Sequence, residues 1–263
     1  MGKAYVLKTV PFEAVTEKRR VLVTGAAGRI GSYFAQHTNS LYELRLMVRG
    51  DEKDIDRIRP FGEVMECDLS DLDGLKRACH EVDTVVHLAA DPHVHSTWDA
   101  LLPNNIVGVY NLFEAARTEG CRRVIFASSV NAMNGYGHEV QIRSEDPVSP
   151  GNLYGVSKCF GEAMCRLYAT KEDLSAIAIR IGAFQTRKTL ASSNYRIPPS
   201  ILVSPRDLCQ LFVKCIDDVT LQFAIFQGLS NNRHNWFDIS DSKELVGYRP
   251  QDDAFEGFDG FDE

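Results

Sequence analysis

The stretch from Val21 to Gly31 limits this chain to a small set of folds. Val21–Thr24 is apolar and largely β-branched, which is typical of a buried strand. Gly-Ala-Ala-Gly-Arg-Ile-Gly follows directly over 25–31, and we expect a helix from there through His37. Such a turn lets a pyrophosphate approach the backbone, and the free N–H groups of the helix then face it. The stretch therefore predicts nucleotide binding on an α/β fold.

The rest of the chain alternates between strand-like and helix-like segments. This alternation favours a Rossmann-type, doubly wound parallel sheet with helices on both faces. We expect one catalytic domain over 19–254, with a small C-terminal substrate-binding lobe mainly over 183–254. An N-terminal arm or leader strand (1–18) precedes it, and an acidic tail (255–263) follows. The expected strands are 43–48, 64–67, 84–88, 123–127 and 176–181, and the expected helices are 71–81, 101–119 and 154–171.

Tyr154 and Lys158 are four residues apart on an expected helix, so they share one face. A phenol has a pKa of about 10 and is a poor base unless a nearby ammonium favours the phenolate. Ser128 and Ser129 follow the strand 123–127, where a hydroxyl can hold a substrate oxygen. Alone, the tyrosine and the lysine are better explained by a ring that packs on a lysine stem.

Taken together, these motifs resemble the extended short-chain dehydrogenase/reductase family, the NAD-dependent epimerase/dehydratase family. The resemblance covers about residues 20–250, and within the family it is greatest to uronate dehydrogenases and related sugar dehydrogenases. It implies an NAD(P)-dependent oxidoreductase that oxidises a uronate or an aldose at the anomeric carbon, giving a lactone. The matching segments are the glycine-rich turn, 68–69, 87–90, Asn105, 126–129, 153–162, 194–196 and 245–253.

The resemblance also assigns roles to single residues. Ser129, Tyr154 and Lys158 become the catalytic residues: Tyr154 takes the hydroxyl proton, Ser129 holds the oxygen, and Lys158 lowers the tyrosine pKa and binds the nicotinamide ribose. Asn105 would steady the lysine through a bound water. The expected cofactor-binding residues are Gly25, Gly28, Arg29, Ile30, Gly31, Arg49, Asp68, Leu69, Leu88, Ala89, Ala90, Asn105, Tyr154, Lys158 and Ile181.

The end of the second strand bears on the choice of cofactor. Sites that prefer NAD usually have an acidic residue there, whereas an arginine can accept the 2′-phosphate of NADP. The uronate dehydrogenases have an aspartate where this chain has Val48, and Arg49 follows, which favours NADP over NAD. In the alternative, Arg49 is solvated and Asp51 or Glu52 reaches the ribose. Asp68 would lie beside the adenine, although Asp68 or Ser70 could instead start the next helix.

The resemblance is weaker at the substrate. Ser129, Asn131, Tyr154 and Arg196 are the expected substrate residues, and a guanidinium suits a carboxylate or a phosphate equally. The uronate dehydrogenases have asparagine and histidine at positions 130 and 131 and serine at 183, where this chain has valine, asparagine and alanine. A sugar phosphate is therefore an alternative substrate. A histidine and tryptophan loop (His93, His95 and Trp98) either covers the sugar or is only structural.

Other functions and partners are judged from the motifs, composition and length. A sugar-nucleotide epimerase or dehydratase would use the same three residues but usually needs a larger C-terminal lobe, and a non-catalytic NADP sensor commonly loses the tyrosine or the lysine.

The net charge of −7 and pI near 5.5 argue against nucleic acid or an anionic membrane as partners. The seven cysteines form no Cys-x-x-Cys pair, which fits a reduced cytoplasmic protein, and no cluster has metal-ligand spacing. We expect a homodimer through helices 101–119 and 154–171.

Overall fold

The computed structural model describes residues 5–8, 18–186, 189–190 and 197–256. Its main sheet has eight strands in the order β4-β3-β2-β5-β6-β7-β10-β1, and all neighbours are parallel except β1, which is antiparallel to β10. The order reverses between β2 and β5, so this is a doubly wound Rossmann-type sheet, as expected. The strands are β1 (Val6–Lys8), β2 (Arg20–Thr24), β3 (Glu43–Val48), β4 (Glu63–Glu66), β5 (Thr84–His87), β6 (Arg123–Ser129), β7 (Ser175–Ile181) and β10 (Leu221–Gly228).

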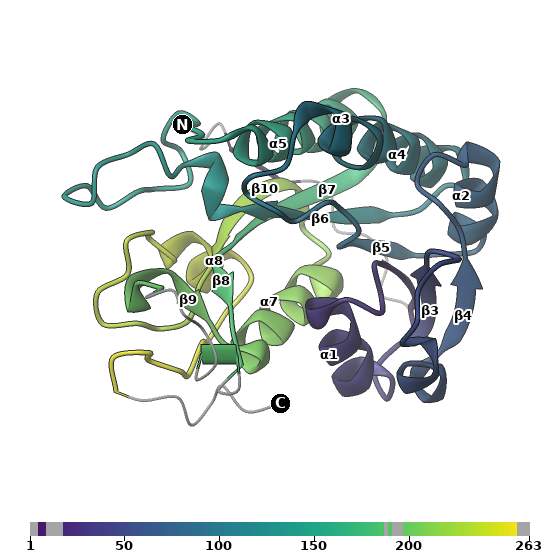
Figure 1. The fold of residues 1–263 in the computed structure, drawn as a ribbon, viewed down its shortest axis with the longest axis horizontal. Coiled ribbons are helices and arrows are strands. Elements are labelled where there is room, and N and C mark those ends of the chain that lie inside the picture. The colour runs from purple at the N-terminus through teal and green to yellow at the C-terminus, as the bar shows by residue number, and fades with distance from the viewer. Residues whose placement is uncertain (1–4, 9–17, 187–188, 191–196, 257–263) are drawn as a thin grey trace.

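Helices cover both faces of this sheet (Figure 1). One face packs against α1 (Arg29–Thr38) and α7 (Pro205–Asp217). The other packs against α2 (Leu72–Cys79), α4 (Gly108–Thr118) and α5 (Leu153–Lys171). Successive side chains of a strand point to opposite faces, and both faces are apolar because both are covered.

The expected helix 101–119 is divided into three parts. A short α3 (Trp98–Leu101) leads into a π-helical segment, Leu102–Val107, and α4 begins only at Gly108. The Gly108 N–H donates to the carbonyl of Pro103, five residues back, so the turn is wider than in an α-helix. The spacing of apolar residues does not predict this wider turn, because the helices on either side of it keep an α-helical spacing.

The C-terminal stretch 183–254 divides between two places. The β10 strand belongs to the main sheet, and α7 packs on one face of it. In contrast, β8 (Ala183–Phe184), β9 (Leu202–Val203) and α8 (Ser240–Leu245) lie beyond the carboxyl ends of the strands (Figure 1). A separate small core, which includes Met133, Ile142 and Phe237, packs this part against the segment that follows β6. This C-terminal part is therefore anchored directly beside the end of β6.

Two surface features bear on the expected partners. On the face covered by α4 and α5, Tyr110 and Leu167 keep about half of their side chains exposed, at 50% and 49%. The expected homodimer through these helices stays a prediction. Within the described part of the chain, no helix is long and apolar enough to cross a membrane.

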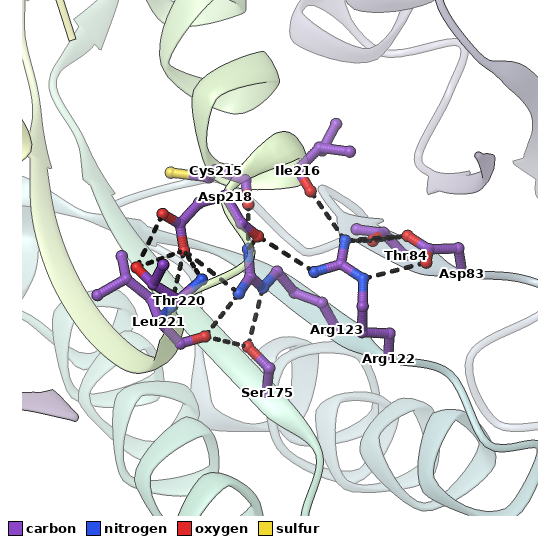
Figure 2. Close-up of polar contacts among 10 residues, drawn as sticks. All are labelled: Asp83, Thr84, Arg122, Arg123, Ser175, Cys215, Ile216, Asp218, Thr220 and Leu221. Carbon is purple, nitrogen blue, oxygen red and sulfur yellow. Dashed lines mark hydrogen bonds and ion pairs between the residues drawn. The ribbon is translucent and has the colours of Figure 1, made fainter. Parts of the chain in front are cut away.

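Two adjacent arginines close the edge of the sheet at the amino ends of its parallel strands (Figure 2). Arg123, fully buried, donates to the Ser175 hydroxyl and to the carbonyls of Cys215, Asp218 and Leu221. Arg122 holds the Asp83 carboxylate and the carbonyl of Ile216. The last carbonyls of a helix have no partner within it, so these guanidinium groups satisfy the end of α7 and join it to three strands.

We predict that Arg123→Met lowers the free energy of unfolding by about 3 kcal/mol, because it leaves buried carbonyls without donors. Urea unfolding followed by circular dichroism measures the change. The control is Arg59→Met, since Arg59 pairs with Asp56 on the surface and its side chain is 60% exposed. This change should cost less than about 0.5 kcal/mol. Equal losses in the two variants would contradict the assignment.

Candidate active site

The turn between β2 and α1 forms a cradle with free backbone donors. Gly25 has a φ of +66°, and a Cβ there would lie 2.9 Å from the backbone N of Ala89. Gly28 is the N-cap of α1 and offers no side-chain cap, so the first N–H groups of the helix remain available. Beneath the turn, the Thr24 hydroxyl accepts hydrogen bonds from the N–H groups of Leu88 and Ala89, both at 3.1 Å. This close packing and these donors fit a pyrophosphate.

A cleft of about 740 Å³ runs from this cradle along the carboxyl ends of the strands. It lies at the switch point between β2 and β5, where open α/β sheets bind ligands. The structure thus brings most of the expected site residues together. Those that line the cleft are Gly25, Gly28, Arg29, Ile30, Gly31, Arg49, Asp68, Leu69, Leu88, Ala89, Ala90, Ser129, Asn131, Tyr154, Lys158 and Ile181.

One expected site residue is not described, and another is described outside the cleft lining. Arg196 lies outside the described residues, so its role stays a prediction. Asn105 is buried in the π-helical segment and does not line the cleft; its side chain holds the N–H and the carbonyl of Asp91 and donates to the Ser157 hydroxyl. It thereby joins the loop after β5 to α5, and the expected water-mediated contact with Lys158 stays a prediction.

Lys158 and Tyr154 project from the first turns of α5 into the cleft. The Lys158 Nζ donates to the Ala127 carbonyl at 2.9 Å and lies 5.4 Å from the centre of the Tyr154 ring. Burial lowers the pKa of Lys158 to about 8, because the charged ammonium loses its water. Burial raises the pKa of Tyr154 to about 12; a hydrogen bond with Ser129 opposes this rise and the charge of Asp91 adds to it.

Ser129 ends β6 and faces the tyrosine. Its Oγ accepts two hydrogen bonds from Asn131, one from the backbone N at 3.2 Å and one from Nδ2 at 3.1 Å. Ser128, one position earlier, points to the other side of the strand and donates to the buried Glu162 at 2.6 Å. Both serines line the cleft, but the strand alternation turns the Ser128 hydroxyl to Glu162 of α5 and leaves the Ser129 hydroxyl on the other side.

The far end of the cleft has the residues expected at the adenosine. Arg49 forms an ion pair with Asp51 at 3.2 Å on the surface. Both were candidates for the adenosine ribose or its 2′-phosphate, so the two candidates contact each other. Glu52, the third candidate, lines the cleft. The Asp68 carboxylate accepts from the N–H and hydroxyl of Ser70, which lowers its pKa. The N-cap of α2 is Asp71, so neither Asp68 nor Ser70 starts that helix.

Several cleft residues had no assigned role in the sequence. Asp91, Asn104 and Gln185 line it: Asp91 and Gln185 follow the ends of β5 and β8, and Asn104 lies in the π-helical segment. Position after a strand was the signal that could have indicated Asp91 and Gln185. His93 also lines the cleft, whereas Trp98 begins α3 with half of its side chain exposed. Among the described residues, no group of three or more histidine, cysteine, aspartate or glutamate side chains could hold a metal ion.

The chain is similar to known proteins over most of its length. The model of the NAD dependent epimerase/dehydratase family matches residues 21–188. The chain is 34% identical over 251 residues to the NAD-dependent glucose-6-phosphate dehydrogenase of Haloferax volcanii, covering 90% of this chain and 94% of that one. It is also 34% identical over 237 residues to the uronate dehydrogenase of Agrobacterium fabrum, covering 90% and 86%.

A solved structure extends the likeness to three dimensions. A point mutant of the uronate dehydrogenase from Agrobacterium tumefaciens, complexed with NAD, superimposes with a TM-score of 0.81 at 32% sequence identity. The match covers 91% of this chain and 87% of the other. The similarity therefore extends over nearly the whole fold, from the glycine-rich turn into the C-terminal lobe.

We predict that Gly25→Ala weakens dinucleotide binding at least tenfold, because the new Cβ meets the Ala89 backbone and moves the cradle. Titration calorimetry with NAD and NADP measures it. Gly247→Ala is the matched control: Gly247 has a φ of +68°, but a Cβ there meets nothing within 4 Å. Both changes strain the backbone by about 1 kcal/mol. Only Gly25→Ala should affect binding, and an equal effect of both would refute the cradle.

Proposed function

The chain belongs to the NAD dependent epimerase/dehydratase family, and from this premise we propose that it is a sugar dehydrogenase that oxidises a uronate or an aldose at the anomeric carbon with NAD(P). One observation carries the proposal. Ser129, Tyr154 and Lys158 converge at one end of a cleft whose other end is a dinucleotide cradle. A hydroxyl bound against Tyr154 would lie beside the place where a nicotinamide enters.

The described side chains have distinct tasks in such an oxidation. Tyr154 takes the proton of the sugar hydroxyl, and Ser129 donates a hydrogen bond to the same oxygen. Lys158 is held by the Ala127 carbonyl, so its remaining N–H groups are available to ribose hydroxyls and its charge favours the phenolate. When bound, the nicotinamide supplies the acceptor for the hydride that leaves the carbon. Because burial lowers the pKa of Lys158 to about 8, the charge beside this proton is lost as the pH rises past that value.

The substrate class is proposed from the relatives and from Arg196. Relatives of similar identity act on different sugars by name: glucose-6-phosphate, uronate and L-arabinose. We favour a uronate, with Arg196 holding its carboxylate through two parallel hydrogen bonds.

A sugar panel with both cofactors, followed by the absorbance of the reduced nicotinamide, tests the proposal. Uronates, sugar phosphates and neutral aldoses form its three arms. Oxidation of a neutral aldose alone would overturn the carboxylate contact, and oxidation of none of them would overturn the proposed function. Silent turnover of a nucleotide sugar would indicate an epimerase.

The cofactor part of the proposal is a preference for NADP. Val48 and Arg49 line the adenosine end, where an NAD enzyme usually has a carboxylate that follows the second strand. Arg49 is 63% exposed, so its guanidinium can leave Asp51 for a 2′-phosphate without losing buried contacts. The Haloferax volcanii relative is named as NAD-dependent, so binding of the two cofactors is compared directly.

We predict that Tyr154→Phe lowers turnover by about 100-fold or more, because no phenol remains to take the proton. Cofactor affinity should remain nearly unchanged. Initial rates on the best sugar of the panel, with cofactor titration, measure both quantities. Tyr136→Phe serves as the control, since Tyr136 bonds the Pro147 carbonyl away from the cleft. Wild-type turnover in Tyr154→Phe would exclude the mechanism.

For Arg49→Ala we expect a loss of about 1.5–3 kcal/mol in NADP binding, the range for a hydrogen bond to a charged group, with NAD binding nearly unchanged. Calorimetric titration with each cofactor measures the difference. Arg59→Ala, a similarly exposed arginine outside the cleft, is the control. Equal losses for the two cofactors, or a wild-type preference for NAD, would refute the assignment.

A further inference from the structure

Three asparagine side chains connect the start of α5 to Ser129. The Asn131 Oδ1 accepts hydrogen bonds from the Nδ2 groups of Asn134 and Asn152, both at 3.0 Å. Its own Nδ2 donates to the Ser129 Oγ at 3.1 Å. Asn152 is also the N-cap of α5, the helix of Tyr154, and its Oδ1 accepts from the Gly155 N–H at 2.7 Å. We call these three residues, Asn131, Asn134 and Asn152, the amide relay.

Two backbone N–H groups fix the direction of every amide in the relay. A backbone N–H can only donate, so the Gly155 N–H requires the oxygen of Asn152, and the Gly151 N–H at 2.7 Å requires the oxygen of Asn134. The Nδ2 groups of both residues must then point to Asn131. Because they only donate, they meet the oxygen of Asn131, and the Nδ2 of Asn131 is left to face Ser129.

This direction determines where the Ser129 proton goes. A serine hydroxyl has two acceptor positions and one proton. Both acceptor positions of Ser129 are filled by Asn131, through its backbone N and its Nδ2. The proton of Ser129 therefore points away from Asn131, into the cleft that Ser129 and Tyr154 both line. A reversed amide would present an oxygen to Ser129 and attract that proton.

We propose that Asn131 is a positioning residue for the reaction: held by Asn134 and Asn152, it directs the Ser129 proton to the oxygen shared by the substrate and Tyr154. The role rests on the proposed function for its catalytic meaning, but the hydrogen-bond direction stands without it. Asn131 was expected to contact the substrate, whereas in the structure both ends of its amide have protein partners. The N-cap of α5 thus acts on the proton of Ser129, at the end of β6.

Asn152→Asp and Asn152→Ser separate the relay from helix capping. Asparagine, aspartate and serine are similarly good N-caps, so both variants keep α5 in place. Only aspartate puts a second acceptor oxygen against the Asn131 Oδ1, while Asn134 still donates to that oxygen. The repulsion displaces the Asn131 amide, so that its Nδ2 no longer fixes the direction of the Ser129 proton. We expect Asn152→Asp to lower kcat by about tenfold or more, the scale of a misdirected catalytic hydrogen bond, with KM for the cofactor unchanged. The loss in Asn152→Ser should be several times smaller.

A double-mutant cycle excludes a direct effect of the new charge on Tyr154, which the charges of Lys158 and Asp91 also face. If the relay acts through Ser129, Asn152→Asp should have no further effect on kcat in a Ser129→Ala background. Losses that multiply, or equal losses in Asn152→Asp and Asn152→Ser, would overturn the proposal. Asn231→Asp is the general control, because Asn231 accepts from Lys243 away from the cleft and a carboxylate keeps that bond.

A measurement without turnover keeps this result separate from the proposed function. In the NMR spectrum of protein labelled with ¹³C-tyrosine, the signal that disappears in Tyr154→Phe belongs to the Tyr154 ring. Asn152→Asp should shift that signal in the same direction as Ser129→Ala, while Asn231→Asp leaves it in place. These shifts in a protein that oxidises no sugar would support the relay and refute the dehydrogenase. Absence of the Asn152→Asp shift would refute the relay whatever the activity.

Discussion

The docking of α5 on β6 and β7 is the constraint on which the rest of the site depends. A Cβ at Gly161 would lie 2.1 Å from the Phe126 ring, so only glycine allows the helix this close to the strand. The next residue, Glu162, is buried and forms an ion pair with Arg180 at 2.8 Å and 2.9 Å. Breaking such a buried pair leaves an uncompensated charge and costs several kcal/mol, so it fixes the helix rather than merely adding stability. From this position Lys158 reaches the Ala127 carbonyl.

The two ends of the parallel strands differ in how completely their polar groups are satisfied. At the amino ends, Arg122 and Arg123 distribute their donors over a carboxylate, hydroxyls and helix carbonyls (Figure 2). At the carboxyl ends, the α1 terminus has no side-chain cap, and one acceptor is found for Lys158 among the described residues. The polar groups described at the amino ends are therefore paired within the protein, whereas the carboxyl ends keep donors for ligands.

The sequence predicted the parts of this structure that depend on local patterns. The strands from 21 to 181, the long helix α5 and most cleft residues follow from apolar runs, glycines and the spacing of Tyr154 from Lys158. Features that depend on contacts between residues far apart in the sequence were not predicted. The π-helical segment around Asn105 follows from contacts with the Asp91 loop and Ser157, and the amide relay joins residues 21 positions apart. The periodicity of apolar residues carries no information about such hydrogen-bonded pairs.

The relay links the capping of α5 to the proposed proton transfer, because Asn152 takes part in both. Burial raises the pKa of Tyr154 to about 12 and lowers that of Lys158 to about 8, so the low-dielectric site disfavours both charged forms. A hydrogen bond directed at the phenol oxygen is one of the few forces that oppose this penalty on Tyr154. Its direction depends on Asn131, and Asn131 is set by Asn152, which caps the helix that carries Tyr154. The residue that starts α5 therefore helps to determine the ionisation of its own tyrosine.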